Sequence, residues 1–251
     1  MGSVAPSPDH PIQSPDHLVP SPHYPITPLL HPLVFLIDVD ETLLNNDAVC
    51  EDLKRHLVEV VGDEGKRRYW ELFEELWAEL GYADYLGALQ RYRLERLGDS
   101  ELLGLASYLL EYPFRDRLYP GALETIGALR HRAPVVVLTD GDAVHQPNKI
   151  ERSGIRQAVD GHVLIYVHKE EMLDDIARRY PAEHYVMVDD KLRILTAIKA
   201  QWKDRVTTVF VRQGHYALDP LLTGSFPSAD VTIERIADLP AADILIPGRV
   251  G

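Results

Sequence analysis

Runs of mostly apolar residues, each of the length of a β-strand, recur along the chain from residue 33 onward. They span residues 33–37, 135–138, 163–167, 185–188, 206–211 and 231–233. Such a run is typical of a strand that is covered on both faces. Helical patterns lie between the runs, at residues 121–132, 172–180 and 192–202. This alternation predicts an α/β fold, in which helices pack on both faces of a doubly wound parallel sheet.

Residues 45–118 depart from this pattern, because they contain no β-rich run and hold half of the aromatic residues. Large apolar side chains recur with helical spacing between Tyr69 and Leu80. Glycines that suit helix ends lie at Gly62, before this stretch, and at Gly81 and Gly98, after it. We therefore expect a helical insert between the first and second strands. Its aromatic stripe is expected to form the insert's own core, with binding of an aromatic substrate as the alternative.

The first 32 residues have a third character. Nine of the 18 prolines and four of the 11 histidines lie here, whereas Lys and Arg are absent. Proline at this density removes backbone donors and favours extended conformations. The predicted organisation is thus a flexible, Pro-rich tail at residues 1–32, a core made of residues 33–44 and 119–251, and a helical insert at residues 45–118.

Composition narrows the range of functions. The chain has 39 acidic and 26 basic residues and a net charge of −13, which argues against binding to nucleic acid. A single cysteine, Cys50, excludes an intramolecular disulfide. No apolar run approaches the ~20 residues of a membrane helix, and the N-terminus lacks the pattern of a signal peptide. We expect a cytoplasmic protein that does not bind membranes; the sequence specifies no oligomeric state.

Chemically versatile side chains follow four of the predicted strands. They are Asp38, Asp40, Thr139, Lys169, Asp189 and Asp190. In a parallel sheet, ligands bind beyond the carboxyl ends of the strands, where these residues would meet. Clustered carboxylates suit Mg²⁺, while a hydroxyl and an ammonium group suit phosphate oxygens. The set favours phosphoryl transfer to an aspartate; the alternative is that the carboxylates only cap backbone N–H groups at strand ends.

The segment from Phe35 to Leu43 resembles the first motif of the haloacid dehalogenase (HAD) superfamily. Residues 137–141 are similar to its second motif, Lys169 to its third, and Val188-Asp189-Asp190 to its fourth in the paired-Asp form. The resemblance covers about residues 33–240. It implies a Rossmann-like core, with the helical insert in the place of the family's C1 cap.

The resemblance also implies roles. Asp38 would attack phosphorus, and Asp40 would protonate the leaving group and then activate water. Thr139 and Lys169 would hold the phosphoryl group. The Mg²⁺ ligands would be Asp38, the backbone carbonyl of Asp40, Asp190 and, directly or through a neighbour, Asp189. True dehalogenases of the superfamily lack the second aspartate of the first motif, so Asp40 argues against that chemistry.

Two departures from the family pattern concern these roles. Glu170, rather than proline, follows Lys169, and Lys149 or Lys191 is an alternative for the phosphate-contacting lysine. Ile194 and Leu195 stand where the fourth motif often has another acidic residue. Further candidates near the site or in the insert are Asp142, His145, Arg67, Arg68, Arg91, Arg93, Arg96 and His215. For His145 a helix start or a surface position is expected, and for the arginines a solvated helix face paired with nearby Glu.

Taken together, the motifs predict a Mg²⁺-dependent phosphatase that hydrolyses a small phosphorylated metabolite. One alternative is a phosphotransferase or mutase, which would keep both motif-one aspartates but shield the aspartyl-phosphate from water. Another is a non-catalytic binding protein of the same fold.

Overall fold

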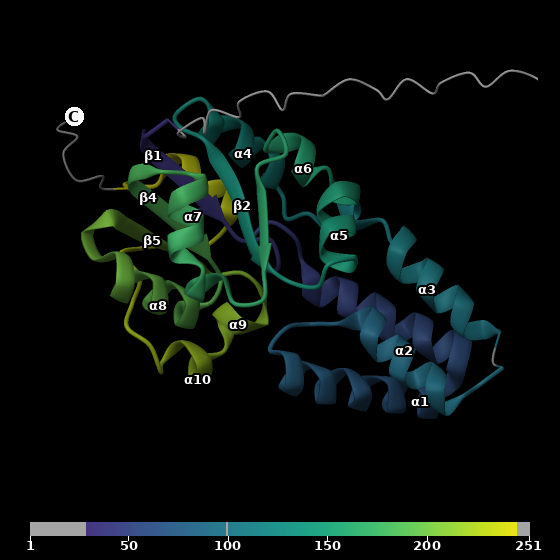
Figure 1. The fold of residues 1–251 in the computed structure, drawn as a ribbon. Coiled ribbons are helices and arrows are strands. Elements are labelled where there is room, and N and C mark those ends of the chain that lie inside the picture. The colour runs from purple at the N-terminus through teal and green to yellow at the C-terminus, as the bar shows by residue number, and fades with distance from the viewer. Residues whose placement is uncertain (1–28, 99, 245–251) are drawn as a thin grey trace, which may run out of the picture.

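A parallel sheet forms the centre of the molecule in this computed structural model, which describes residues 29–98 and 100–244 (Figure 1). Its strands are β1 (His31–Ile37), β2 (Val135–Asp140), β3 (Val163–Tyr166), β4 (Ala182–Asp189), β5 (Val206–Val211) and β6 (Val231–Ile233). The spatial order is β3-β2-β1-β4-β5-β6, and every pairing is parallel. The direction of winding reverses between β1 and β4, so the crevice for a ligand lies beyond the ends of these two strands.

Helices cover both faces of this sheet, as the runs of apolar residues predicted. On one face, the side chains of Phe35 and Ile37 pack with α4 (Ala122–Arg130), α5 (His145–Ser153) and α6 (Ile155–Ala158). On the other, Val34 and Leu36 pack with α7 (Leu173–Arg179) and α8 (Leu192–Trp202). Successive residues of β1 thus enter opposite cores, because side chains alternate along a strand. The doubly wound α/β fold is confirmed.

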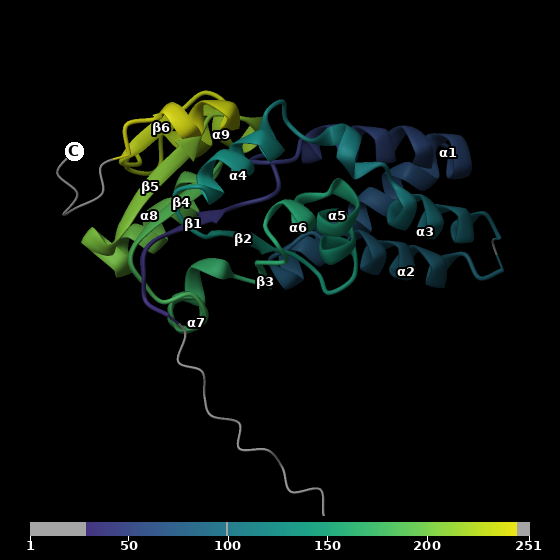
Figure 2. The same cartoon turned by 90° about the horizontal axis from the view of Figure 1, so that it is seen from above.

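Three helices that follow β1 form a core of their own. They are α1 (Asn46–Leu80), α2 (Tyr85–Glu95) and α3 (Glu101–Glu111), and the short 3₁₀ helix η1 (Phe114–Arg117) after them contributes Phe114 to the core of the sheet instead. In Figures 1 and 2, α1, α2 and α3 lie together beyond one end of the sheet. Gly62, with φ +72°, interrupts α1, and Gly81, with φ +80°, ends it.

The aromatic stripe of α1 contributes to this separate core, with one exception. Tyr69 is buried and Trp70 and Phe73 pack against the same cluster, whereas Trp77 is 48% exposed. The expectation of an insert core was therefore wrong for Trp77, which lies on the outer side of the helix.

The edges of the fold differ in detail from the sequence pattern. β1 begins at His31, inside the segment predicted as tail, because its first residues pair with Ala182 at the start of β4. Most of that predicted tail, residues 1–28, lies outside the described residues. After β5 come α9 (Gly214–Leu218) and α10 (Pro220–Thr223), and the 3₁₀ helix η4 (Ile236–Ala241) follows β6. Among the described residues, no helix has the length and apolar character needed to cross a membrane.

Candidate active site

Three buried carboxylates meet where β1 and β4 end. The register pairs Ile37 with Val188, so Asp38 follows β1 directly beside Asp189 at the end of β4. Oxygen atoms of Asp38, Asp189 and Asp190 lie within 4.8 Å of one another, and no more than 4% of any of these residues is exposed. The parallel pairing of two strands thus converts two distant sequence motifs into one acidic cluster.

The cluster has more negative charge than its protein neighbours compensate. Both carboxylate oxygens of Asp190 are buried without a hydrogen-bond partner among the described residues. Burial raises the pKa of Asp190 well above its ordinary value, although Lys191 opposes the shift. Burial likewise raises the pKa of Asp38 to about 7 against the pull of Lys169. Oxygen donors at this spacing fit a hard divalent cation such as Mg²⁺, whose charge would keep the carboxylates ionised.

Lys169 reaches into the cluster from η2 (Lys169–Glu171), the 3₁₀ helix after β3. Its Nζ contacts Asp38 Oδ1 and lies 2.7 Å from Asp189 Oδ2 and 3.3 Å from the carbonyl oxygen of Leu138. Burial alone would lower the pKa of Lys169, but Asp189 and Asp38 outweigh it and the pKa rises. The side chain is therefore a buried ammonium group beside the candidate nucleophile.

The second carboxylate of the first motif has different neighbours. Asp40 Oδ1 lies 2.7 Å from Lys149 Nζ, and Asp40 Oδ2 accepts a hydrogen bond of 3.2 Å from Gln146 Nε2. Burial would raise the pKa of Asp40, but the Lys149 ammonium outweighs it and the pKa falls below its ordinary value. Asp38 and Asp40 thus contact different lysines: Asp38 contacts Lys169, and Asp40 contacts Lys149. Lys149 contacts Asp40 rather than Asp38, and Lys191 has its Nζ over the ring of Tyr216, 4.6 Å from the centroid.

Thr139, next to the last residue of β2, is buried. Its Oγ1 accepts a hydrogen bond of 3.0 Å from Gln146 Nε2, so one amide contacts both Thr139 and Asp40. A Cβ at Gly141 would lie 2.6 Å from Gln146 Cβ, so only glycine lets α5 approach this closely. The next carboxylate, Asp140, accepts a 2.7 Å hydrogen bond from the backbone N–H of Lys169 and fixes that residue's loop.

Sequence reasoning did not single out Gln146 or Asp140, and it considered Lys149 only as a substitute for Lys169. A signal was present in α5. Gln146 and Lys149 are three residues apart and share one face of the helix directly after the second motif.

The remaining candidates lie outside the cluster. Asp142 accepts backbone hydrogen bonds from Val144 and His145 at the start of α5. His145 begins that helix as predicted, but it is 2% exposed instead of lying at the surface, and burial lowers its pKa to about 4. Three of the five candidate arginines pair with glutamates: Arg67 with Glu71, Arg68 with Glu71, Glu75 and Glu95, and Arg91 with Glu79. His215 pairs with Asp47 at the start of α1.

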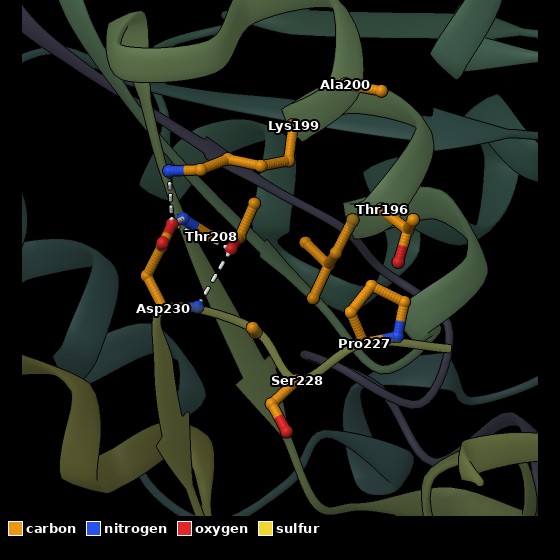
Figure 3. A pocket seen from close by; sticks show the side chains of 9 residues that line it. Thr196, Lys199, Ala200, Thr208, Pro227, Ser228 and Asp230 are labelled. Carbon is orange, nitrogen blue, oxygen red and sulfur yellow. Dashed lines mark hydrogen bonds and ion pairs between the residues drawn. The ribbon is translucent and has the colours of Figure 1, made fainter. Parts of the chain in front are cut away.

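Two cavities lie near the sheet. One, of about 570 Å³, is bounded by Tyr82 of the insert and by the loops after β2 and β3, including Asp142 and His168. The other, of about 330 Å³, lies between α8, the start of β5 and the loop before β6 (Figure 3). There Lys199 Nζ is 2.8 Å from Asp230 Oδ2. None of the six predicted site residues lines either cavity.

Comparisons with known proteins bear on the family and the fold. The sequence profile of the haloacid dehalogenase-like hydrolases matches residues 33–200. A protein of Burkholderia xenovorans described as a haloacid dehalogenase-like hydrolase is 59% identical; the match covers 85% of this chain and 99% of that one, with a TM-score of 0.81.

Two more distant structures share the fold. L-2-haloacid dehalogenase of Xanthobacter autotrophicus, solved with chloropropionic acid covalently bound, is 17% identical with a TM-score of 0.55 over 84% of this chain and 98% of that one. The HAD-hydrolase YfnB of Bacillus subtilis, solved with magnesium, is 17% identical with a TM-score of 0.56 over 83% of this chain and 97% of that one. No curated protein sequence matches the chain.

Proposed function

The chain belongs to the haloacid dehalogenase-like hydrolases, and on this premise we propose that it is a phosphatase that uses Mg²⁺ to hydrolyse a small phosphorylated metabolite. The observation that carries the proposal is the pair Asp38 and Asp40. Two carboxylates on one turn of chain, each with its own lysine, supply a nucleophile and a separate group that can carry a proton. A reaction that only displaces halide needs no proton donor for its leaving group.

The proposed reaction has two displacements at phosphorus. In the first, a carboxylate oxygen of Asp38 bonds to phosphorus as the ester P–O bond breaks, and Asp40 gives its proton to the departing oxygen. In the second, Asp40 takes a proton from water as the water oxygen bonds to phosphorus and the bond to Asp38 breaks. Inorganic phosphate takes up the proton from Asp40 and leaves, so both carboxylates return to their ionised starting state.

Asp40 poses a question of proton supply. Its pKa is lowered by Lys149, so Asp40 is ionised at neutral pH and suits the second displacement, in which it accepts a proton. The first displacement needs Asp40 protonated. A phosphate monoester, whose second pKa is about 6, can bring that proton into the site.

Lys169 and Thr139 are proposed to hold the phosphoryl oxygens. Lys169 already lies against Asp38, so an ammonium group would meet the charge that develops as the phosphoryl group transfers. Asp38, Asp189, Asp190 and the carbonyl of Asp40 would hold Mg²⁺. The cation would supply charge stabilisation for the phosphoryl oxygens and the carboxylates.

The helices of residues 45–118 are proposed to serve as a cap that restricts substrates to small molecules. Support comes from Asn46, the first residue of α1, whose Oδ1 accepts a hydrogen bond of 3.0 Å from Lys149 Nζ. The insert therefore contacts the residue that pairs with Asp40. A cap over the site would exclude bulk water during the reaction.

A screen of phosphorylated metabolites with Mg²⁺, run beside the Asp38→Asn variant, tests the proposal. We expect phosphate release from the wild type and none from the variant. A 2-haloacid belongs in the same screen: halide release without phosphate release would show a dehalogenase, and transfer of phosphate to an added acceptor at the expense of hydrolysis would show a phosphotransferase.

A further inference from the structure

Lys149 is a buried cation that the proposed reaction does not use. It lies on α5, and only 2% of its side chain is exposed. An ammonium group is costly to bury unless partners compensate its charge and hydrogen bonds. The two partners found are Asp40 Oδ1 at 2.7 Å and Asn46 Oδ1 at 3.0 Å. Lys149 thus joins the candidate acid/base to the first residue of α1.

The contacts of Asp40 leave its carboxylate little freedom. Lys149 holds one oxygen, and Gln146 on the same helix holds the other at 3.2 Å. The same Gln146 amide contacts Thr139 at 3.0 Å. The side chain of Asp40 is nevertheless 25% exposed, so it can still reach a substrate. These contacts hold both carboxylate oxygens of Asp40 from α5, and the exposed part of the side chain remains accessible to a substrate.

We propose that Lys149 is a positioning residue that holds Asp40 in line with the leaving group. This role rests on the phosphatase proposed above. Lys149 makes no contact with Asp38, the position where the covalent bond forms, so it acts through Asp40 alone. Replacement of Lys149 should therefore slow a reaction in proportion to how strongly that reaction depends on proton transfer by Asp40.

The kinetic test compares two substrates that differ in leaving group. An alkyl phosphate needs protonation of its leaving oxygen, whereas 4-nitrophenyl phosphate needs little. We expect Lys149→Met to lower kcat about 10–100-fold for the alkyl phosphate, as misplacement of a catalytic group by about 1 Å does, and less than about fivefold for the nitrophenyl ester. In an Asp40→Asn background, Lys149→Met should cause no further loss with either substrate.

A matched control is available in α8. Lys199 also forms a 2.8 Å pair with a carboxylate, Asp230 (Figure 3). Lys199 Nζ also contacts the carbonyl oxygen of Val206, the first residue of β5, whereas the candidate site lies beyond the last residues of the strands. Lys199→Met should leave both rates unchanged. Equal losses with the two substrates in Lys149→Met, a further loss in the Asp40→Asn background, or a higher KM with unchanged kcat would overturn the positioning role.

A second readout does not depend on activity. In chelator, the effects of Lys149→Met and Asp40→Asn on the melting temperature should be non-additive. The melting temperature of the double variant should fall by at least about 3 °C less than the sum of the two single decreases. Additive shifts would overturn the proposal. If the wild type hydrolyses no phosphate ester, the proposed function fails by itself and this unfolding cycle still decides whether Lys149 holds Asp40. If Lys149→Met does not fold, Lys149→Gln, whose side chain is polar but shorter and uncharged, takes its place in both experiments with the same outcomes.

Discussion

Asp190 is expected to destabilise the protein when no cation is bound, so replacing it should stabilise the cation-free form. Both of its oxygens are buried without a hydrogen-bond partner among the described residues, and burial raises its pKa well above the ordinary value. A buried group without partners costs about 1–3 kcal/mol, and more when it is charged, so an uncharged amide at this position should recover a cost of about that size. For a domain of this size, 1 kcal/mol shifts the melting temperature by about 2–4 °C. Asp190→Asn should therefore melt roughly 2–12 °C above the wild type in excess chelator at pH 8.

Addition of Mg²⁺ should reverse this order. A ligand at 100 times its Kd stabilises the folded state by about 2.7 kcal/mol, which corresponds to roughly 5–10 °C here. The melting temperature of the wild type should rise by that amount when Mg²⁺ is added. The melting temperature of Asp190→Asn, which lacks one ligand for the cation, should rise much less. The wild-type rate of phosphate release should disappear in chelator and return with Mg²⁺.

Asp230 provides the matched control for Asp190. Its carboxylate is partnered by Lys199 and by the backbone N–H and hydroxyl of Thr208, so Asp230→Asn should lower the melting temperature and leave the Mg²⁺ shift intact. Differential scanning fluorimetry of the three proteins, with chelator and with Mg²⁺, measures all of these quantities. A lower melting temperature for Asp190→Asn in chelator, or a full Mg²⁺ shift in that variant, would refute the reasoning.

Four further outcomes are expected. Asp38→Asn should abolish turnover, whereas Asp40→Asn should slow it about 10²–10⁴-fold, less for a good leaving group; equal losses that ignore the leaving group would show that the division of roles is wrong. In chelator, the melting temperature of the wild type minus that of Asp38→Asn should fall as the pH rises from about 4 to about 7, because folded Asp38 holds its proton up to a pKa of about 7 while the unfolded chain releases it near 3.8; a flat difference would contradict this shift. Gly81→Ala should lower the melting temperature by roughly 2–6 °C, since φ is +80° and the new Cβ would lie 2.5 Å from the His168 ring, whereas Gly104→Ala, in open space within α3, should not. Deletion of residues 1–30 should leave melting and catalysis unchanged, and a large drop in melting temperature would show that this segment packs on the core.

The sheet and the acidic cluster could be predicted because each depends on local sequence and one general rule. A strand buried on both faces has to be apolar throughout, so Phe35 and its neighbours mark β1 without any knowledge of its partners. Parallel strands then bring their carboxyl ends to one edge. That rule places Asp38 beside Asp189 although about 150 residues separate them.

The contacts of Asp40 could not be predicted in the same way. Gln146 and Lys149 lie in a polar segment that is typical of a solvated helix, yet both are buried. They are buried because Asn46 and Tyr85 of the insert pack over the start of α5, a contact between segments about 60–100 residues apart. His145, expected at the helix start or the surface, is enclosed by the same packing. A local sequence pattern predicts that a segment is helical, but it does not predict which other helix packs over that segment.

The two motif-one aspartates show what such packing adds to the chemistry. Asp38 and Asp40 are two residues apart and start from the same ordinary pKa. Burial among carboxylates raises the pKa of Asp38, whereas the Lys149 ammonium lowers the pKa of Asp40. Without a cation, the protonation states are the reverse of those that the reaction needs. The nucleophile, Asp38, would hold a proton near neutral pH, and the acid, Asp40, would lack one. A bound cation would restore the ionised nucleophile, and the proton of a phosphate monoester would restore the acid. The resting site is therefore expected to be inactive until both cation and substrate have entered, which links catalytic competence to binding.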